Sequence, residues 1–526
     1  MKYSGNLYEQ FLQKTISENR VIIGSELGEK LKNKFNIQPE NARQIIQRAY
    51  KKGVINSSKP LSFGKGQFAY YLGTTKLDVN KIKEIAKNQR PTLFNLLTGL
   101  EINEGILSYY EALKISASPL KKISTKVDYL EDLITLLEKL EILITRTDGN
   151  SIRYLILKSK EGKDDLMHSH YTKMLLDTAL IKDILDWFIK SNLIDNQNVI
   201  YRNRINPSKG AKHNNLIWDA FAYTKTTGLR DRSKDEADST KQTLVVFDIL
   251  INREYEKFDL DGFLNRIQIN LNAVKGGKRK ILPIIIYKNC SDKVENTIKK
   301  LGFLSYDIGA IYGTNIFKIL ENISQIKLDK EILKYENLDQ IIENTLTTIQ
   351  SSGQEDQLKA LKGTLFEVLM FQVIKNRYPS SEIQTNYFFS RQLKDQKKEG
   401  YEYDYIIRSS NPKEIIVIEL KGYKSNYEIA LGDAKTKGSI SWFFRNTLPF
   451  IKEKFKNELS EGYQFRGCYI TTSGFSVDAL KCLENLSKSK LKPKEFELFY
   501  DRKKLLNFME EKNFNHLKTI IEKYYK

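Results

Sequence analysis

The 526-residue chain carries 85 Lys and Arg residues against 65 Asp and Glu residues, which gives a net charge of +20. Single domains commonly run to ~100–200 residues, so this length excludes one hydrophobic core and predicts three or four domains. The 40% apolar and 11% aromatic shares exclude a disordered chain. The positive surplus favours nucleic acid as the partner, although a merely soluble basic protein would show it too.

The cysteines and histidines carry little chemistry. Cys290, Cys468 and Cys482 are too scattered for a disulfide framework, and four histidines without paired spacing exclude a zinc cluster. The N-terminus has no apolar core for a signal peptide, and the longest buried-looking run, 281–287, is too short to span a membrane. We therefore expect a soluble, cytoplasmic protein without a membrane partner.

The first segment has the pattern of a winged helix. Its apolar periodicity predicts helices at residues 6–19, 24–35 and 39–52. Residues 54–72 then change to two short strands around the basic turn at 63–66. Winged helices place the third helix in a DNA groove and the wing along the backbone, so we assign 1–75 to this fold and expect Lys65 to contact nucleic acid. The alternative is a module that binds protein.

The same order of elements recurs in residues 76–160. Helices are predicted at residues 91–98, 105–117 and 129–140. Residues 143–157 follow as strand, turn and strand, so a second winged helix is predicted. Its third helix is acidic, which favours DNA contact less than in the first module and leaves a spacer between domains as the alternative.

Residues 165–325 change to an α/β order of helix, three strands, helix and strand. Residues 326–352 are predicted to form a helical connector, and the segment 351–354 is the best candidate boundary before a last domain at 353–526. The chain is therefore predicted to be a multidomain α/β protein with tandem N-terminal winged helices.

Acidic residues are placed unusually in the last domain. Glu419 lies in the β-branched run 415–421, which predicts a central strand, and Lys421 points to the same face. Burying such charges costs roughly several kcal/mol each without partners, so they indicate a metal or an ion pair. Asp404 lies fifteen positions earlier (419 − 404) on the predicted hairpin partner, which brings the two carboxylates side by side.

This arrangement suits phosphodiester cleavage. Carboxylates can hold Mg²⁺ at ~2.0–2.1 Å while leaving positions for water and the scissile phosphate. An ammonium at Lys421 can orient or help deprotonate the attacking water and neutralise developing charge. Glu367, on the preceding helix, can reach the same metal. The alternative is a surface strand with an ordinary salt bridge, which the apolar run around Glu419 disfavours.

Asp404, fourteen intervening residues and Glu419-Leu420-Lys421 resemble the core motif of the PD-(D/E)XK nuclease superfamily. The segments GTLFE at 363–367 and ITTSGFSVDAL at 470–480 resemble the first helix and a later strand-to-helix turn of Mrr-like restriction endonucleases. The similarity covers roughly residues 355–500. Glu419 stands where Mrr-type enzymes often carry Gln, so the similarity to the superfamily is closer than the similarity to that branch.

The resemblance implies a restriction-endonuclease-like α/β fold and assigns the site residues. It implies Asp404, Glu419 and the backbone carbonyl of Leu420 as ligands of Mg²⁺, for which Mn²⁺ can substitute. Lys421 would be the catalytic lysine and Glu367 an auxiliary acid. We also expect nucleic-acid contact from Lys435 and Lys437, which precede the aromatic run 442–445, although such aromatics are more often core.

The middle region can be aligned with the last domain as a degenerate restriction-endonuclease-like copy. Asp183, Asp219 and Asp248 then correspond to Glu367, Asp404 and Glu419, and Leu250 stands in place of Lys421. The acids could still hold a metal, but the lysine that assists water attack is missing. The alternative is that any helix-plus-sheet domain can be aligned this loosely.

We therefore expect a metal-dependent endonuclease that cuts DNA, in its double-stranded form, in restriction or anti-phage defence. A second copy of the chain or a defence-system partner fits this role. Two alternatives stay open: an RNA-cleaving toxin or nicking repair nuclease with the same site, and a DNA-binding regulator or assembly subunit whose nuclease folds only grip DNA.

Overall fold

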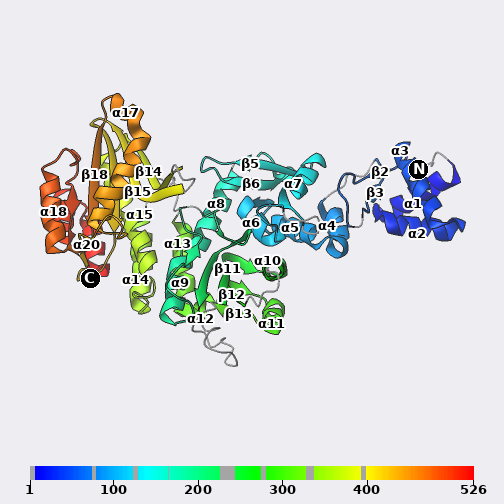
Figure 1. Cartoon of the computed structure of the whole chain (residues 1–526), viewed down its shortest axis with the longest axis horizontal. Helices are drawn as coiled ribbons and strands as arrows, with labels where there is room; N and C mark the ends of the chain where they lie inside the picture. The colour runs from blue at the N-terminus through cyan, green and yellow to red at the C-terminus, as the bar shows by residue number, and fades with distance from the viewer. Residues whose placement is uncertain are drawn as a thin grey trace.

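The computed structural model describes residues 6–64, 66–73, 79–122, 128–163, 165–205, 207–224, 243–273, 280–326, 337–392 and 398–526. These residues form an elongated, mixed α/β multidomain protein, with the N-terminal helices at one end and the last sheet at the other (Figure 1). Within the described parts of the chain, no helix is both long enough and apolar enough to cross a membrane.

The first unit contains the predicted three helices and hairpin. Its helices are α1 (Leu7–Asn19), α2 (Gly24–Phe35) and α3 (Pro39–Lys51), and its sheet has the order β1 (Val21–Ile23), β3 (Ala69–Tyr71), β2 (Asn56–Ser57). Buried Leu12, Leu27 and Ile46 join the three helices in one apolar cluster. The sequence did not predict β1, and Lys65 lies outside the described residues.

The second unit repeats this order with an additional helix. Its elements are α4 (Val79–Gln89), α5 (Pro91–Ile102), β4 (Ile106–Ser108), α6 (Tyr109–Ser116), α7 (Leu130–Lys139), β5 (Leu143–Thr147) and β6 (Arg153–Leu157). The helix predicted at 105–117 is therefore shorter than expected. Its first residues form β4, which pairs with β6, and Ser108 caps α6 by accepting from the backbone N–H of Glu111.

The middle unit is built on a five-stranded sheet in the order β13-β12-β11-β10-β7. The strands are β7 (Ile200–Tyr201), β10 (Ala220–Thr224), β11 (Thr243–Tyr255), β12 (Ile281–Cys290) and β13 (Leu304–Asp307). A separate hairpin joins β8 (Ala211–His213) and β9 (Leu216–Trp218). The helices are α8 (Asp165–Thr178), α9 (Ile181–Lys190), α10 (Lys257–Asn272), α11 (Asp292–Lys300), α12 (Ile308–Tyr312) and α13 (Asn315–Gln325).

The last unit has a five-stranded sheet in the order β14-β15-β16-β18-β20. The strands are β14 (Glu382–Gln392), β15 (Lys398–Ser410), β16 (Lys413–Lys421), β18 (Gln464–Thr471) and β20 (Phe499–Tyr500). The main helices are α15 (Lys359–Arg377), α18 (Val477–Ser487), α19 (Arg502–Glu511) and α20 (Asn515–Tyr524), and β17 (Glu428–Ile429) pairs with β19 (Gly474–Phe475).

The two five-stranded sheets share one topology. In each, the first two strand pairs along the chain are antiparallel and the next two are parallel. The central strands are buried on both faces: Ile416 and Ile418 of β16 face one apolar cluster, while Ile415 and Val417 face another. This burial explains why β16 and β11 appear in the sequence as continuous apolar runs. The shared topology agrees with the predicted duplication.

One apolar cluster joins the middle and last units. It takes Phe247 from β11 and Ile418 from β16, together with Leu346 and Ile349 of α14 (Leu338–Ser351). Helix α14 packs against α13, α15 and α20. The helix predicted as a connector at 326–352 is therefore part of a shared core, although residues 327–336 lie outside the described chain.

Candidate active site

The sheet of the last unit places Asp404 beside Glu419. Tyr405 of β15 lies opposite Ile418 of β16, so the next residues outward, Asp404 and Glu419, face each other across the two strands. The Oδ2 atom of Asp404 accepts a hydrogen bond of 2.7 Å from the backbone N–H of Leu420. This bond fixes the carboxylate at the point where the hairpin pairing ends. The predicted adjacency of the two acids is present.

The ammonium of Lys421 lies among the oxygens of the predicted metal ligands. Its Nζ is 2.5 Å from Oε1 of Glu419 and 3.1 Å from the carbonyl oxygen of Leu420. Oδ2 of Asp404 is 4.0 Å away. Burial opposes the charge on Lys421, but Glu419 and Asp404 hold its pKa well above the ordinary value. Three oxygens from two strands therefore converge on one positive charge.

Glu367 reaches the same place from α15. The hydroxyl of Tyr405 donates to the Glu367 carbonyl at 2.7 Å, which ties the helix to β15. The Glu367 carboxylate is paired with Arg204, whose guanidinium also donates to Oδ1 of Asn386 at 2.8 Å. Burial raises the pKa of Glu367 to about 7; Arg204 opposes this shift and Asp404 adds to it.

Acidic groups outnumber basic groups among these side chains. Burial raises the pKa of Glu419 to about 7, the charge of Lys421 lowers it, and the neighbouring Asp404 raises it. Three carboxylates here face two cations, Lys421 and Arg204. We call Glu367, Asp404, Glu419 and Lys421 the acidic site. A bound cation would favour the ionised forms of Glu367 and Glu419, which burial now disfavours.

The acidic site has the donor set that a hard cation prefers, without a ready-made cage. Among the described residues, no three His, Cys, Asp or Glu side chains are grouped as a metal site. The reason is that each carboxylate points to its own partner: Glu367 to Arg204, Glu419 to Lys421 and Asp404 to a backbone N–H. Two carboxylates and one carbonyl already lie around the Lys421 ammonium, so their oxygens fit Mg²⁺ once that side chain moves aside.

A cleft of about 530 Å³ lies beside the acidic site and is lined by three units of the chain. Its walls come from residues 149–152 of the β5–β6 turn, from the middle-unit loop at Arg204, Ile205 and 207–209, and from residues 384–388 and Ser390 of β14. Arg204 lines the cleft and also pairs with Glu367, so this one side chain connects the wall of the cleft with the acidic site. A ligand in it would contact the second, middle and last units together.

The middle sheet holds a second pair of acids in the same geometry. Ala220 of β10 lies opposite Phe247 of β11, so Asp219 and Asp248 face each other one position further on. Oδ2 of Asp219 accepts from the backbone N–H of Ile249 at 2.8 Å, as Asp404 accepts from Leu420. The predicted correspondence of Asp219 and Asp248 with Asp404 and Glu419 thus has a geometric basis.

This middle pair is sealed by cations. Asp219 is 0% exposed and Asp248 is 2% exposed. Lys114, from α6 of the second unit, contacts Asp219 and lies 3.0 Å from Asp248. Arg202 is 3.1 Å from Asp219, and Arg266 is 2.8 Å from Asp248. The hydroxyls of Tyr110 and Tyr255 donate to the two carboxylates at 2.6 and 2.9 Å. All four carboxylate oxygens are therefore already paired within the protein.

The lysine missing from the middle sheet is supplied by another unit. Leu250, predicted to replace Lys421, lies in an apolar cluster with Trp218 and Phe263. Lys114 instead brings an ammonium to both acids, as Lys421 does in the last unit. Burial lowers the pKa of Lys114, but the charges of Asp219 and Asp248 outweigh this effect and hold the pKa above its ordinary value.

The predicted correspondence of Asp183 with Glu367 is wrong. The Asp183 carboxylate accepts from the backbone N–H groups of Ala360 and Leu361, at 2.8 and 2.9 Å, and so caps the first turn of α15. Asp177, at the end of α8, lies near the middle pair and is 3.6 Å from Arg202. The middle unit has two helices, α8 and α9, where the last unit has the continuous helix α15. A similar number of residues before the first aspartate of each pair therefore does not place Asp183 and Glu367 at equivalent positions in space.

The segment after β16 contributes exposed lysines and buried aromatics. Lys435 and Lys437 lie exposed in a loop in which Asp433 accepts from the backbone N–H of Lys435 at 2.9 Å. Lys437 is near enough to Glu402 to lower the pKa of that carboxyl, although burial raises it overall. Phe443 and Phe444 are buried in the apolar cluster of the last sheet, so they are core and cannot stack on a base.

Arg204 and Lys114 were missed by the sequence analysis. Their partners lie 163 and 105 residues away in the chain. For Arg204, the sequence signal is its position two residues after Arg202, just beyond a short predicted strand. Such a pattern is too common to indicate a site.

No protein-family model matches the sequence, and comparison with curated proteins finds no relative. Among solved structures, the chain is similar to protein VC1899 from Vibrio cholerae, with 14% sequence identity and a TM-score of 0.20. The similarity covers 43% of this chain and 58% of that protein, so the chain spans little more than half of its length. A likeness at this level carries no argument about fold or function.

Proposed function

We propose that the chain is a metal-dependent endonuclease of the PD-(D/E)XK type that cleaves phosphodiester bonds in DNA. The observation that carries the proposal is the convergence of Glu419, the Leu420 carbonyl and Asp404 on the Lys421 ammonium, at 2.5, 3.1 and 4.0 Å. Buried acids of this kind cost free energy unless they serve a cation, and the motif D-x₁₄-E-x-K that they form resembles that superfamily.

Asp404, Glu419 and the Leu420 carbonyl would hold Mg²⁺, or Mn²⁺ in its place. When bound, the ion supplies Lewis-acid activation of water and of the scissile phosphate. We assign Lys421, whose ammonium lies 2.5 Å from Glu419, to orienting or helping to deprotonate the attacking water and to neutralising charge on the phosphate.

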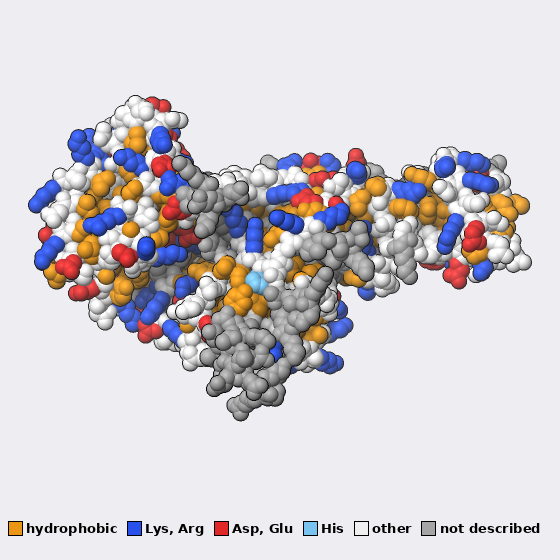
Figure 2. All heavy atoms as spheres, viewed as in Figure 1, with side chains coloured by type: hydrophobic (Ala, Val, Ile, Leu, Met, Phe, Trp, Pro, Cys, Tyr) orange, Lys and Arg blue, Asp and Glu red, His pale blue; other side chains and the backbone are white. Residues whose placement is uncertain are grey.

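The cleft supports a polyanionic substrate. Arg204 and Lys209 line it, and Arg204 is held towards the acidic site by Glu367 and Asn386. Figure 2 shows Lys and Arg side chains spread along the whole face of the molecule, which accords with the net charge of +20. Such a surface attracts DNA without sequence preference, and the cleft would align a strand with the acidic site.

The other units would position DNA. The first and second units have the helix and strand order of winged helices, and the middle unit has the sheet topology of the last one. The middle unit would then be a degenerate nuclease fold that binds DNA or supports the last unit without cleaving. Its two acids are paired with Lys114, Arg202 and Arg266. A role in restriction or anti-phage defence rests on the family resemblance alone.

The proposal is tested by incubating the purified chain with supercoiled plasmid, linear duplex, single-stranded DNA and RNA, each with Mg²⁺, Mn²⁺ or EDTA. We expect metal-dependent cleavage of DNA that EDTA abolishes. Cleavage of RNA alone would replace DNA as the substrate class, and no cleavage of any substrate in either metal would contradict the proposal.

A further inference from the structure

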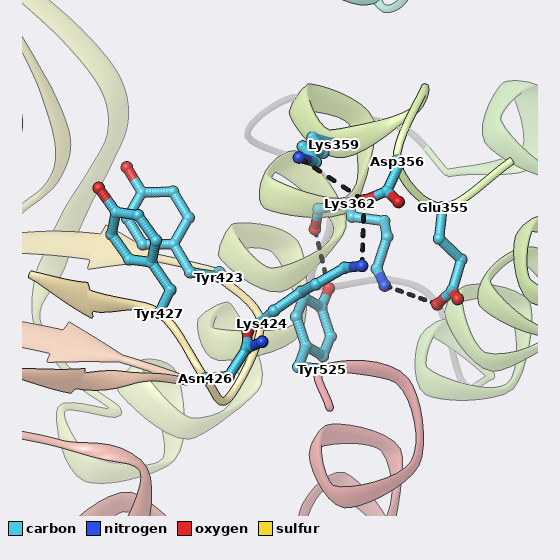
Figure 3. Close-up of a pocket in the computed structure, with 10 residues that line it drawn as sticks. Glu355, Asp356, Lys359, Lys362, Tyr423, Lys424, Asn426, Tyr427 and Tyr525 are labelled. Carbon is cyan, nitrogen blue, oxygen red and sulfur yellow. Dashed lines mark hydrogen bonds and ion pairs between the residues drawn. The ribbon is translucent and has the colours of Figure 1, made fainter.

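A pocket of about 400 Å³ lies next to the acidic site, between the loop that leaves β16 and the start of α15 (Figure 3). Tyr423 and Tyr427 stand on one side of it, Lys359 and Asp356 on the other, and Lys424 reaches across from the loop towards Asp356. The volume falls within the range of roughly 300–1,000 Å³ that is typical of small-ligand pockets.

The two tyrosines form an exposed aromatic surface. Tyr423 is 37% exposed and Tyr427 is 52% exposed, although most large apolar side chains of the described chain are buried. Their ring centroids are 4.7 Å apart, with planes at 61°. The hydroxyl of Thr472 donates to the Tyr423 carbonyl at 2.6 Å, and the backbone N–H of Gly474 donates to the Tyr427 carbonyl at 3.1 Å. The backbone that carries the two rings is therefore tied to residues 472–474.

Two of the pocket's lysines, Lys424 and Lys359, are held by weak contacts that a ligand can replace. Nζ of Lys424 is 3.0 Å from Oδ1 of Asp356, and Nζ of Lys359 is 3.6 Å from the same atom. The Asp356 side chain is 66% exposed, and ion pairs this exposed contribute little. A phosphate could take the place of Asp356 between the two ammonium groups and bring more negative charge to them.

A third lysine forms the wall. Lys362 is buried, and its Nζ donates to the carbonyl of Tyr524 at 2.6 Å and to Glu355 at 3.0 Å. Its ammonium also lies 5.3 Å from the centre of the Tyr525 ring, and the Tyr525 hydroxyl donates to the Lys362 carbonyl at 2.8 Å. These contacts hold the C-terminal residues against α15, so this wall of the pocket is formed by packed, hydrogen-bonded side chains.

Two residues that line the pocket come directly after the acidic site in the sequence. Gly422 and Tyr423 follow Lys421 in sequence, and the Lys421 carbonyl accepts from the backbone N–H of Thr472 at 3.1 Å. The pKa of the Tyr423 hydroxyl, which burial raises, is also affected by the charges of Lys421 and Glu419. A strand with one phosphate at Lys421 would thus present a neighbouring nucleotide to the tyrosines.

We propose that this pocket binds one unpaired nucleotide, with the base against Tyr423 and Tyr427 and the phosphate between Lys424 and Lys359. An aromatic surface beside paired ammonium groups has the chemistry of a nucleoside monophosphate, because every base has a face that stacks. The source is either a free nucleotide or an unpaired end of a nucleic-acid strand. Binding at this pocket goes beyond the proposed function and does not depend on cleavage.

The test measures binding in EDTA, where the proposed cleavage cannot occur. Isothermal titration of the full chain with AMP, adenosine and a short single-stranded oligodeoxynucleotide is repeated with Tyr427→Ala and Lys424→Ala. The matched controls are Tyr427→Phe, which keeps the ring, and Lys481→Ala, which removes an exposed lysine of α18. Circular dichroism checks folding of every variant.

We expect AMP to bind more tightly than adenosine, and Tyr427→Ala to weaken AMP roughly 5- to 100-fold, as loss of one base–aromatic stack does. Lys424→Ala should weaken AMP and leave adenosine unchanged, and both controls should bind as the wild type does. Binding of the oligonucleotide without AMP, with the same loss in the variants, would assign the pocket to strand ends. The proposal is overturned if neither ligand saturates at millimolar concentration, or if the alanine variants bind both ligands as tightly as their controls.

Discussion

Removing Lys114, which the second unit contributes to the buried pair Asp219 and Asp248 of the middle unit, should cause a large loss of stability. In the variant Lys114→Met, the ammonium that contacts Asp219 and lies 3.0 Å from Asp248 is lost. Lys114 is only 11% exposed and both acids are buried, so solvent cannot replace the missing charge. The methionine keeps most of the side-chain volume, so the effect isolates the charge.

The size of the effect follows from the remaining partners. Removing one partner of a buried ion pair costs about 3–5 kcal/mol, because a buried charge is left uncompensated. Arg202 and Arg266 still face the two acids at 3.1 and 2.8 Å, so we expect the lower end, about 3 kcal/mol. The double variant Lys114→Met with Asp219→Asn should recover much of this loss, since the neutral amide no longer needs the ammonium.

Urea unfolding provides the assay, followed by circular dichroism and by the fluorescence of the three tryptophans, one of which is Trp218. This residue is fully buried and packs 5.0 Å from the guanidinium of Arg266. Lys173→Met is the matched control, because Lys173 forms an exposed pair with Glu104 that should contribute at most about 1 kcal/mol. If Lys114→Met costs no more than this control, or if Asp219→Asn gives no recovery, the middle pair is not the sealed network described above.

Three further predictions concern the same side chains and their neighbours. The isosteric double variant Asp219→Asn with Asp248→Asn should leave the single-turnover cleavage rate unchanged where circular dichroism shows it folded; a loss of about tenfold or more would make the middle unit catalytic. Arg204→Ala should reduce the slope of log affinity against log salt by about 0.9 for the phosphate contact it loses, and an unchanged slope would remove Arg204 from the DNA path. Burial raises the pKa of Asp183 from 3.8 to about 7, so the native state holds a proton that the unfolded state releases, and stability should fall by roughly 1.4 kcal/mol per pH unit between about pH 4 and 7. Because Glu367 and Glu419 also have pKa values raised to about 7, Asp183→Asn should show a smaller fall than the wild type in thermal unfolding scans, and parallel curves for the two proteins would contradict this prediction.

The sequence predicts what is local in this fold. Helical periodicity located α1 to α3 to within a residue or two, because each buries one apolar face. The hairpin between β15 and β16 could be counted from its turn, so the adjacency of Asp404 and Glu419 followed from residue spacing. The strands β1 and β4 were not predicted, because each has only three residues and pairs with a strand about fifty residues further along the chain.

Tertiary contacts were beyond the sequence. The pairing of Arg204 with Glu367 and of Lys114 with Asp219 depends on how units pack, which no periodicity records. Asp183 shows the opposite failure: its spacing to Asp219 nearly equals that of Glu367 to Asp404, yet it caps α15. The similar spacing was misleading, because Glu367 lies on one continuous helix, α15, whereas the middle unit has two shorter helices, α8 and α9, in that place.

The most direct test of the central claim compares wild-type chain and Lys421→Ala in single-turnover cleavage of supercoiled plasmid with Mg²⁺, with Lys481→Ala as the control on an exposed lysine of the same unit. DNA affinity is measured in EDTA for each protein. Because Lys421 lies 2.5 Å from Glu419 and would act mainly in the transition state, we expect cleavage to fall by at least about a hundredfold while DNA affinity stays near the wild type, with circular dichroism to establish that the variant is folded under the assay conditions. Full cleavage by Lys421→Ala, or equal loss in Lys481→Ala, would contradict the assignment of the acidic site.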